Sequence, residues 1–168
     1  MTDQTPVAAT MPMSAPADYY DMTRVRPEVA AAMAKINELG PVFASRAKAV
    51  DDDASFPTDN YKDLADAGFL GLSIPQEFGG WGFSMGEYAM VGAEIAKYCG
   101  ATALTFNMHN SSMAWSRFMY DMPNLTEAER AAFAPLRAKQ FTRAMKERAI
   151  FSQPISEGGQ NWTSKPNQ

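Results

Sequence analysis

The stretch from residue 56 to residue 84 constrains the fold of this chain most, because turn-forming and apolar residues alternate there with almost no spacer. It begins with a short predicted helix that Thr58 can cap through its hydroxyl and that Gly68 can end in a left-handed turn. An extended apolar run over residues 69–74 follows and stops at Pro75, which has no backbone N–H and disfavours helix in the residue before it. The pattern predicts a helix, an extended segment and a tight loop, all joined to one core.

The loop that follows carries three glycines in four residues, at Gly79, Gly80 and Gly82. We expect Gly79 and Gly80 to adopt backbone conformations that a Cβ atom would disfavour. Aromatic residues beside the glycines can hold the loop against a core; they are Phe78, Trp81 and Phe83. On physical grounds alone, a structural junction is the simplest interpretation, because glycine-rich turns are common.

The order of these residues resembles the acyl-CoA dehydrogenase family. The resemblance is carried by the Phe56-Pro57 pair, residues 67–72, residues 74–80 and Gly82, and it weakens away from this stretch. It implies a mainly α fold, a helical bundle or orthogonal helical domain, that ends in the first strand of a β-domain. It also implies a flavoprotein that oxidises acyl thioesters.

Periodicity and turn residues divide the chain into three parts. Residues 1–24 are expected to form a mobile arm, residues 25–148 the α-helical domain, and residues 149–168 the start of the middle β-domain. The apolar residues 149–156 predict a strand, and the β-domain and C-terminal helical bundle of the family have no counterpart in this sequence.

Within the helical part, capping boxes at Ser84–Glu87 and Thr126–Glu129 predict two helix starts. Two prolines lie inside helical patterns, and we expect a kink or short break at Pro41 and a break at Pro135. The predicted core of the domain consists of Met33, Ile36, Phe43, Leu64, Leu72, Ile95, Leu104, Trp115 and Phe118.

Composition argues against several classes of protein. The net charge of −4 and the scattered Lys and Arg residues argue against nucleic-acid binding. No apolar run approaches the roughly 20 residues of a membrane span. Cys99 is the only cysteine, so a disulfide within the chain or a cysteine zinc cluster is excluded, and no metal site is expected. These features favour a cytoplasmic protein.

The helix predicted over residues 102–120 holds an unusual polar run around His109, the only histidine of the chain. A core histidine that is satisfied by a backbone carbonyl is favoured over a ligand role by roughly two to one on general grounds. The family resemblance implies that this helix lines the acyl-chain tunnel near the flavin. The wall residues would be Thr105, Met108, His109 and Ser112.

Residues 153–161 resemble the family's flavin-contacting segment in part. Gln153 stands where an aromatic residue is usual, and Gly158 replaces the usual proline. The resemblance implies FAD contacts from Ser156 above all, with Ile155, Gly159, Trp162 and Ser164 as further candidates.

The resemblance implies FAD-dependent α,β-desaturation of an acyl-CoA thioester. An electron acceptor such as an electron-transfer flavoprotein and a homo-oligomeric assembly are the implied partners. No carboxylate of this chain matches the family's base, so no catalytic residue is assigned, and the isolated chain is expected neither to bind FAD tightly nor to turn over substrate. Three alternatives remain: a non-catalytic truncated helical interaction module, an acyl-CoA oxidase, and a flavin monooxygenase of the same fold.

Overall fold

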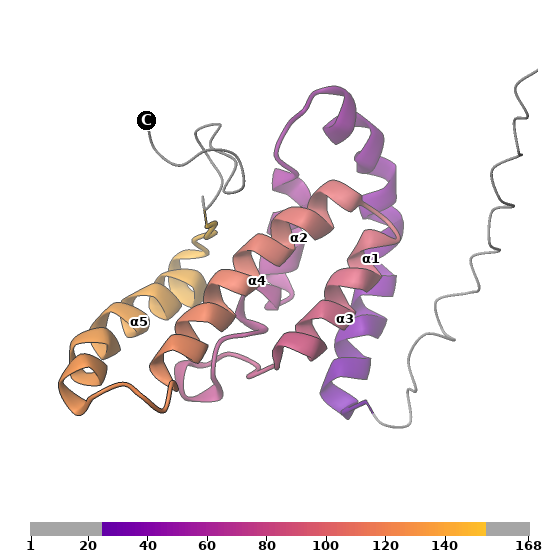
Figure 1. The fold of residues 1–168 in the computed structure, drawn as a ribbon. Helices are drawn as coiled ribbons and strands as arrows, with labels where there is room; N and C mark the ends of the chain where they lie inside the picture. The colour runs from indigo at the N-terminus through magenta and orange to yellow at the C-terminus, as the bar shows by residue number, and fades with distance from the viewer. Residues whose placement is uncertain (1–24, 154–168) are drawn as a thin grey trace, which may run out of the picture.

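A computed structural model describes residues 25–153, and it shows a mainly α fold, as the sequence predicts. The described residues form five α-helices and two short 3-10 helices, and no strand is formed among them (Figure 1). The elements in chain order are α1 (Pro27–Asp52), α2 (Thr58–Asp66), η3 (Phe69–Gly71), η4 (Gln76–Phe78), α3 (Met85–Ala96), α4 (Gly100–Tyr120) and α5 (Glu127–Glu147).

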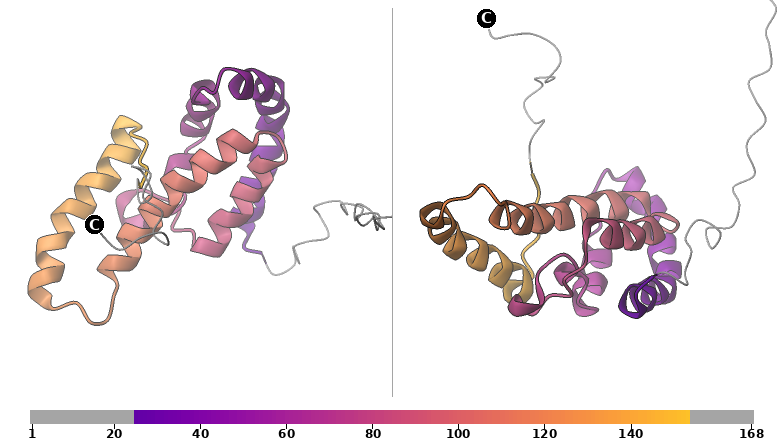
Figure 2. Two further views of the ribbon diagram at one scale, coloured as in Figure 1. Left: turned by 45° about the horizontal axis from the view of Figure 1, so that its top comes forward. Right: turned by 60° about the horizontal axis from the view of Figure 1, so that its bottom comes forward.

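The long helices pack side by side, with α1 at one edge and α5 at the other, and with α3 and α4 between them (Figures 1 and 2). The main core fills the space between α1, α3 and α4, and it includes Ile36, Phe43, Leu72, Ile95 and Phe106. A smaller apolar cluster joins α4 to α5 and consists of Ile74, Met113, Phe141 and Ala144.

Six of the nine predicted core residues are buried, but the other three are on the surface. Leu104 is 67% exposed, Trp115 is 52% exposed and Phe118 is 54% exposed. The prediction was wrong for these three because α4 is apolar on two opposite sides, and only one side faces α1 and α3.

Both predicted capping boxes are present. Ser84 Oγ accepts from the Glu87 backbone N–H while the Glu87 carboxylate accepts from the Ser84 N–H, and Thr126 and Glu129 form the same reciprocal pair. The cap predicted at Thr58 is wrong, because Thr58 is the first helical residue and Pro57 takes the N-cap position; the Thr58 hydroxyl donates to the carbonyl of Phe56. Gly68 takes the predicted left-handed conformation, with a φ of 82°.

The extended run predicted over residues 69–74 is also wrong. Residues 69–71 form η3, and the chain stays compact because Gly71 N–H donates to Gly68 and Ile74 N–H donates to Gly71. A short apolar run does not distinguish an extended segment from a buried helical turn, since both bury every side chain.

The glycine loop folds back onto this turn. Gly79 has a φ of 84°, so the expected glycine-only conformation is confirmed there. Gly80 is not among the positive-φ glycines of the described chain, but a Cβ atom at Gly80 would lie 2.6 Å from the carbonyl carbon of Ile74. Gly80 is therefore required for close backbone approach rather than for its φ angle.

Neither proline interrupts its helix. Helix α1 continues through Pro41 and α5 continues through Pro135, so the predicted break at Pro135 is wrong and no break occurs at Pro41. In α1 the buried residues Met33, Ile36, Gly40 and Phe43 follow one face on both sides of the proline. Continuous packing of that face offsets the roughly 3 kcal/mol that an internal proline costs.

The strand predicted from residue 149 is not formed in the described residues 149–153, which are irregular. A strand needs a neighbouring strand for its backbone hydrogen bonds, and the described chain supplies none. The remainder of that prediction, and the predicted mobile arm, lie outside the described residues.

Candidate functional site

Helix α4 carries two apolar faces. Its inner face packs on the core through Thr102, Phe106, His109 and Met113, which are all buried. Residues three or four positions apart lie on one side of a helix, and the exposed Leu104 and Trp115 therefore share an outer face with the half-buried Met108. A helix that is apolar on both sides is typical of one that is covered on both sides.

An apolar groove of about 360 Å³ lies at the end of this outer face, where the start of α3 meets the last turns of α4. Its lining consists of Phe83, Ser84, Met85, Ala114, Trp115, Arg117, Phe118 and Asp121. Trp115 and Phe118 stack on each other with ring centroids 5.6 Å apart, and Met85 is 58% exposed. Arg117 ties this groove to the glycine loop by donating to the carbonyl of Gly82 at 3.2 Å.

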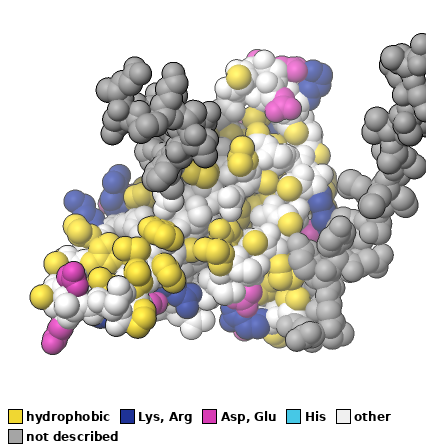
Figure 3. Space-filling model, viewed as in Figure 1, with side chains coloured by type: hydrophobic (Ala, Val, Ile, Leu, Met, Phe, Trp, Pro, Cys, Tyr) yellow, Lys and Arg dark blue, Asp and Glu magenta, His cyan; other side chains and the backbone are white. Residues whose placement is uncertain are grey.

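Apolar side chains extend beyond the groove. Figure 3 shows hydrophobic side chains gathered over α5 and the adjoining part of α4. Leu136 of α5 is 63% exposed. Clusters of this kind on a protein surface mark sites for an apolar ligand or another protein surface.

The structure does not bring the four predicted wall residues together on one surface. Met108 is half-buried and lies on the outer face, and Thr105 is half-buried beside it. Ser112 is buried and its hydroxyl donates to the carbonyl of Met108 at 2.9 Å. The Thr105 hydroxyl donates to the carbonyl of Ala101, also at 2.9 Å, so both hydroxyls are used within α4.

His109 is fully buried, and both ring nitrogens contact backbone groups. Nε2 lies 2.9 Å from the carbonyl oxygen of Leu70, and the N–H of Phe151 donates to Nδ1 at 3.2 Å. Burial lowers the pKa of His109, and the Leu70 carbonyl opposes that change in part. This geometry matches the core histidine that sequence reasoning favoured, with a second backbone partner that it missed.

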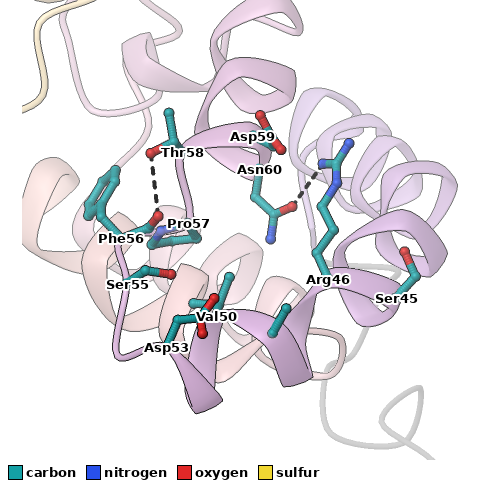
Figure 4. Close-up of a pocket in the computed structure, with 11 residues that line it drawn as sticks. Ser45, Arg46, Val50, Asp53, Ser55, Phe56, Pro57, Thr58, Asp59 and Asn60 are labelled. Carbon is teal, nitrogen blue, oxygen red and sulfur yellow. Dashed lines mark hydrogen bonds between the residues drawn. The ribbon is translucent and has the colours of Figure 1, made fainter.

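A second hollow of about 350 Å³ lies where the end of α1 meets the start of α2 (Figure 4). The cation on its wall is already neutralised, because Arg46 donates to Asn60 at 2.9 Å and to Asp63 at 2.7 Å. Asn60 in turn donates to Thr102 of α4 at 2.8 Å. These bonds join α1, α2 and α4, so the hollow is a polar junction between helices rather than a ligand site.

Helix α5 is attached to the glycine loop through a buried cation. Arg137 is 6% exposed, its guanidinium lies 3.8 Å from the ring centroid of Tyr120, and it donates to Glu77 at 2.7 Å. The Phe78 ring packs against Phe141 of α5 with ring centroids 5.1 Å apart. These contacts fix α5 against the loop.

The predicted FAD contacts lie outside the described residues, so the structure says nothing of Ile155, Ser156, Gly159, Trp162 and Ser164. Sequence reasoning placed an acyl-chain tunnel along this helix but assigned Trp115 and Phe118 to the core, so it missed the residues that line the groove, although a signal for them was present. Trp115 and Phe118 are displaced by about half a turn from the stripe of Phe106 and Met113, and that displacement indicates a second apolar face. None of the described helices is long and apolar enough to span a membrane.

Comparison with known proteins identifies the helical body. The family model of the acyl-CoA dehydrogenase N-terminal domain matches residues 31–121, from the second turn of α1 to just past the end of α4. The chain belongs to the acyl-CoA dehydrogenase family. The match includes the glycine loop and all of α4, so the outer face described above belongs to the family domain.

The relatives of this acyl-CoA dehydrogenase-family chain are named for different reactions of acyl-CoA thioesters. A probable acyl-CoA dehydrogenase of Bacillus subtilis is 35% identical over 64 residues, which cover 38% of this chain and 17% of the relative. Acryloyl-CoA reductase (NADH) of Anaerotignum propionicum is 38% identical over 72 residues, covering 43% of this chain and 17% of the relative. 3-Sulfinopropanoyl-CoA desulfinase of Advenella mimigardefordensis is 38% identical over 81 residues, covering 48% of this chain and 20% of the relative. The matches therefore span about a fifth or less of these relatives.

Proposed function

We propose that this chain supplies the N-terminal helical domain of an FAD-dependent acyl-CoA dehydrogenase-like enzyme, and that the outer face of α4 lines its acyl-chain site. The observation that carries the proposal is the apolar groove between Met85, Trp115 and Phe118, which continues an exposed apolar helix face. A hydrocarbon chain is stabilised on such a surface by about 0.8 kcal/mol for each CH₂ group that it removes from water.

The groove fits an acyl chain and does not fit the charged part of FAD. Arg117 is the only cation of its lining, and Arg117 already donates to a backbone carbonyl. FAD, when bound, would supply the acceptor for the hydride of α,β-desaturation. We assign its contacts to Ile155, Ser156, Gly159, Trp162 and Ser164, and we derive no reaction step from the described residues.

Among the predicted wall residues, Met108 has the strongest support because it lies half-buried on the outer face. Thr105 lies at the edge of that face, beside Tyr61. Burial raises the pKa of the Tyr61 hydroxyl to about 12, so this hydroxyl stays protonated. Ser112 and His109 support the helix from inside. An acyl-CoA thioester as substrate, an electron-transfer flavoprotein as acceptor and a homo-oligomeric enzyme complete the proposal.

A second candidate function is a helical interaction module without catalytic activity. It is favoured by the same exposed side chains, since Leu104, Trp115 and Phe118 could cover an apolar surface of another protein as well as a ligand. Acyl-CoA oxidases and flavin monooxygenases of the same fold would share the domain. The test must therefore detect the acyl chain directly.

The test is titration of the purified chain with short-, medium- and long-chain acyl-CoA while tryptophan fluorescence is followed. Free CoA and a free fatty acid serve as ligand controls. We expect a fluorescence change that grows with acyl length, that is absent with CoA alone, and that is lost in Trp115→Phe. A fatty acid of the same length is expected to respond too, because the groove contacts only the hydrocarbon chain; a response to free CoA, or one that does not grow with acyl length, would count against the proposal.

Two matched substitutions test whether the acyl-CoA that changes the fluorescence is bound in the groove. Phe118→Glu puts a charge inside the groove, whereas Leu136→Glu puts one on α5 at a residue that is similarly exposed and outside the groove lining. Phe118→Glu should weaken acyl-CoA binding by at least about tenfold, which corresponds to 1.4 kcal/mol, because it buries a carboxylate against hydrocarbon. Equal weakening by both substitutions, or by neither, would contradict the groove as the acyl site and favour the interaction module.

A further inference from the structure

His109 connects three parts of the chain that are far apart in sequence. It lies in the middle of α4, Nε2 contacts Leu70 in η3, and Nδ1 contacts Phe151 in the segment after α5. A backbone N–H can only donate, so the Phe151 bond requires Nδ1 to be the acceptor. The proton therefore sits on Nε2 and is donated to the Leu70 carbonyl, which defines one neutral tautomer.

The segment after α5 is also attached at its first residue, where Arg148 pairs with Asp66 of α2 at 2.6 Å. Arg148 ends the helix in a left-handed conformation with a φ of 55°, and the Ala149 N–H donates to the carbonyl of Arg143 at 3.1 Å. From there to residue 153 the chain is irregular. The Phe151 ring packs against the small cluster around Met113 and Phe141, and its N–H is directed to His109.

We propose that His109 is a positioning residue that anchors residues 149–153 to the helical body through the Phe151 N–H. The anchor fixes the point from which the chain continues toward Ser156 and the other residues assigned to FAD. That last step rests on the proposed function, whereas the anchor itself stands on the two hydrogen bonds of the ring.

A neutral imidazole has one N–H donor and one acceptor nitrogen, and the Leu70 carbonyl can satisfy only the donor. The second bond gives His109 a property that packing alone does not. Protonation would place an N–H on Nδ1 against the N–H of Phe151, and the bond would be lost. Burial opposes that protonation. The Arg143 guanidinium lies 5.9 Å from the centroid of the Phe151 ring and is paired with Glu147 at 3.1 Å. The packed residues of η3 are Phe69, Leu70 and Gly71, which carry no charge.

The test compares substitutions that keep one bond each. In His109→Asn the amide oxygen lies near the position of Nδ1 and can accept from Phe151, whereas in His109→Gln the amide nitrogen lies near the position of Nε2 and can donate to Leu70. His109→Ala removes both bonds. Backbone hydrogen exchange at Phe151, followed by NMR on the whole chain, is the readout, and the Ala149 amide is the internal control.

We expect exchange at Phe151 to accelerate on the order of tenfold in His109→Gln and His109→Ala, and His109→Asn to keep most of the protection. Exchange at Ala149 should stay unchanged in all three. Unchanged exchange at Phe151 in His109→Gln would overturn the proposal, and so would the same loss of protection in Asn and Gln.

A measurement on the unsubstituted chain keeps the proposal testable where a variant does not fold. As pH falls and His109 takes up its proton, protection at Phe151 should be lost while Ala149 remains protected. Parallel behaviour of the two amides across the titration would overturn the anchor. Because neither measurement uses a ligand, failure of acyl-CoA binding leaves this result unaffected, and failure of the anchor leaves the acyl-CoA result unaffected.

Discussion

Gly80→Ala is the substitution whose effect the structure defines most closely. An alanine Cβ at this position would lie 2.5 Å from the Cβ of Ile74 and 2.6 Å from its carbonyl carbon. Both distances are under the 3.0 Å that real Cβ contacts keep, and one of the two atoms belongs to backbone. Rotation of a side chain therefore cannot relieve the contact, and the two backbone segments must move apart.

The magnitude follows from what holds those segments together. The Gly82 N–H donates to the Ile74 carbonyl at 2.8 Å, and the Trp81 N–H donates to Gly71 at 3.0 Å. Overpacking a well-filled site costs about 1–3 kcal/mol, and weakening one such hydrogen bond adds about 1 kcal/mol. We expect a loss of about 2–4 kcal/mol, which lowers the Tm of a chain of this size by about 5–15 °C.

Thermal unfolding followed by circular dichroism measures this loss. The control is Gly92→Ala, since a Cβ on Gly92 meets nothing within 4 Å and the residue lies inside α3. Alanine favours a helix over glycine by up to about 1 kcal/mol, so this control should raise the Tm or leave it unchanged. A Gly80→Ala chain with the same Tm as the unsubstituted chain would refute the close-approach argument. The two backbone segments must move apart to relieve the contact, and that movement should lower the Tm.

Two further predictions follow from the same structure. The Arg26 hydrogen bond lowers the pKa of Glu87 to about 2. The unfolded chain therefore binds more protons than the folded chain, and stability falls as pH drops from about 4.5 toward 2. In acid unfolding curves, Glu87→Gln should remove most of that loss, whereas the control Glu38→Gln should not. The isolated chain should show no tight FAD binding and no dye-linked oxidation of acyl-CoA, because the sequence matches the family's flavin-contacting segment only in part and has no carboxylate that matches the family's base. Flavin absorbance that survives gel filtration and bleaches with substrate would contradict this.

Local signals predicted the helix starts and the glycine loop. Ser84 with Glu87, and Thr126 with Glu129, each place a hydroxyl and a carboxylate three residues apart, and that spacing alone satisfies the free N–H groups of a first turn. Gly68 and Gly79 were predicted for a similar reason, since a left-handed residue strongly favours glycine. Such features depend on the chain within a few residues, so they can be predicted from sequence.

The errors concern features that tertiary packing decides. The helix at Pro41 continues because buried residues on both sides of it face the same core, and no local pattern records that benefit. Thr58 does not cap because α2 already begins at Thr58, which leaves Pro57 at the N-cap position. Trp115 was assigned to the core because an apolar residue at helical spacing does not reveal which of two faces the core will cover.

The two faces of α4 explain how the candidate site and the anchor are related. The inner face holds His109, which fixes the segment after α5, and the outer face holds Trp115, which lines the groove. A rigid helix transmits the position of one face to the other, so the same element positions the apolar groove and the segment that follows α5. The polar run around His109 then has a physical reason: the inner face needs a residue that can donate on one side and accept on the other, and a neutral histidine does both.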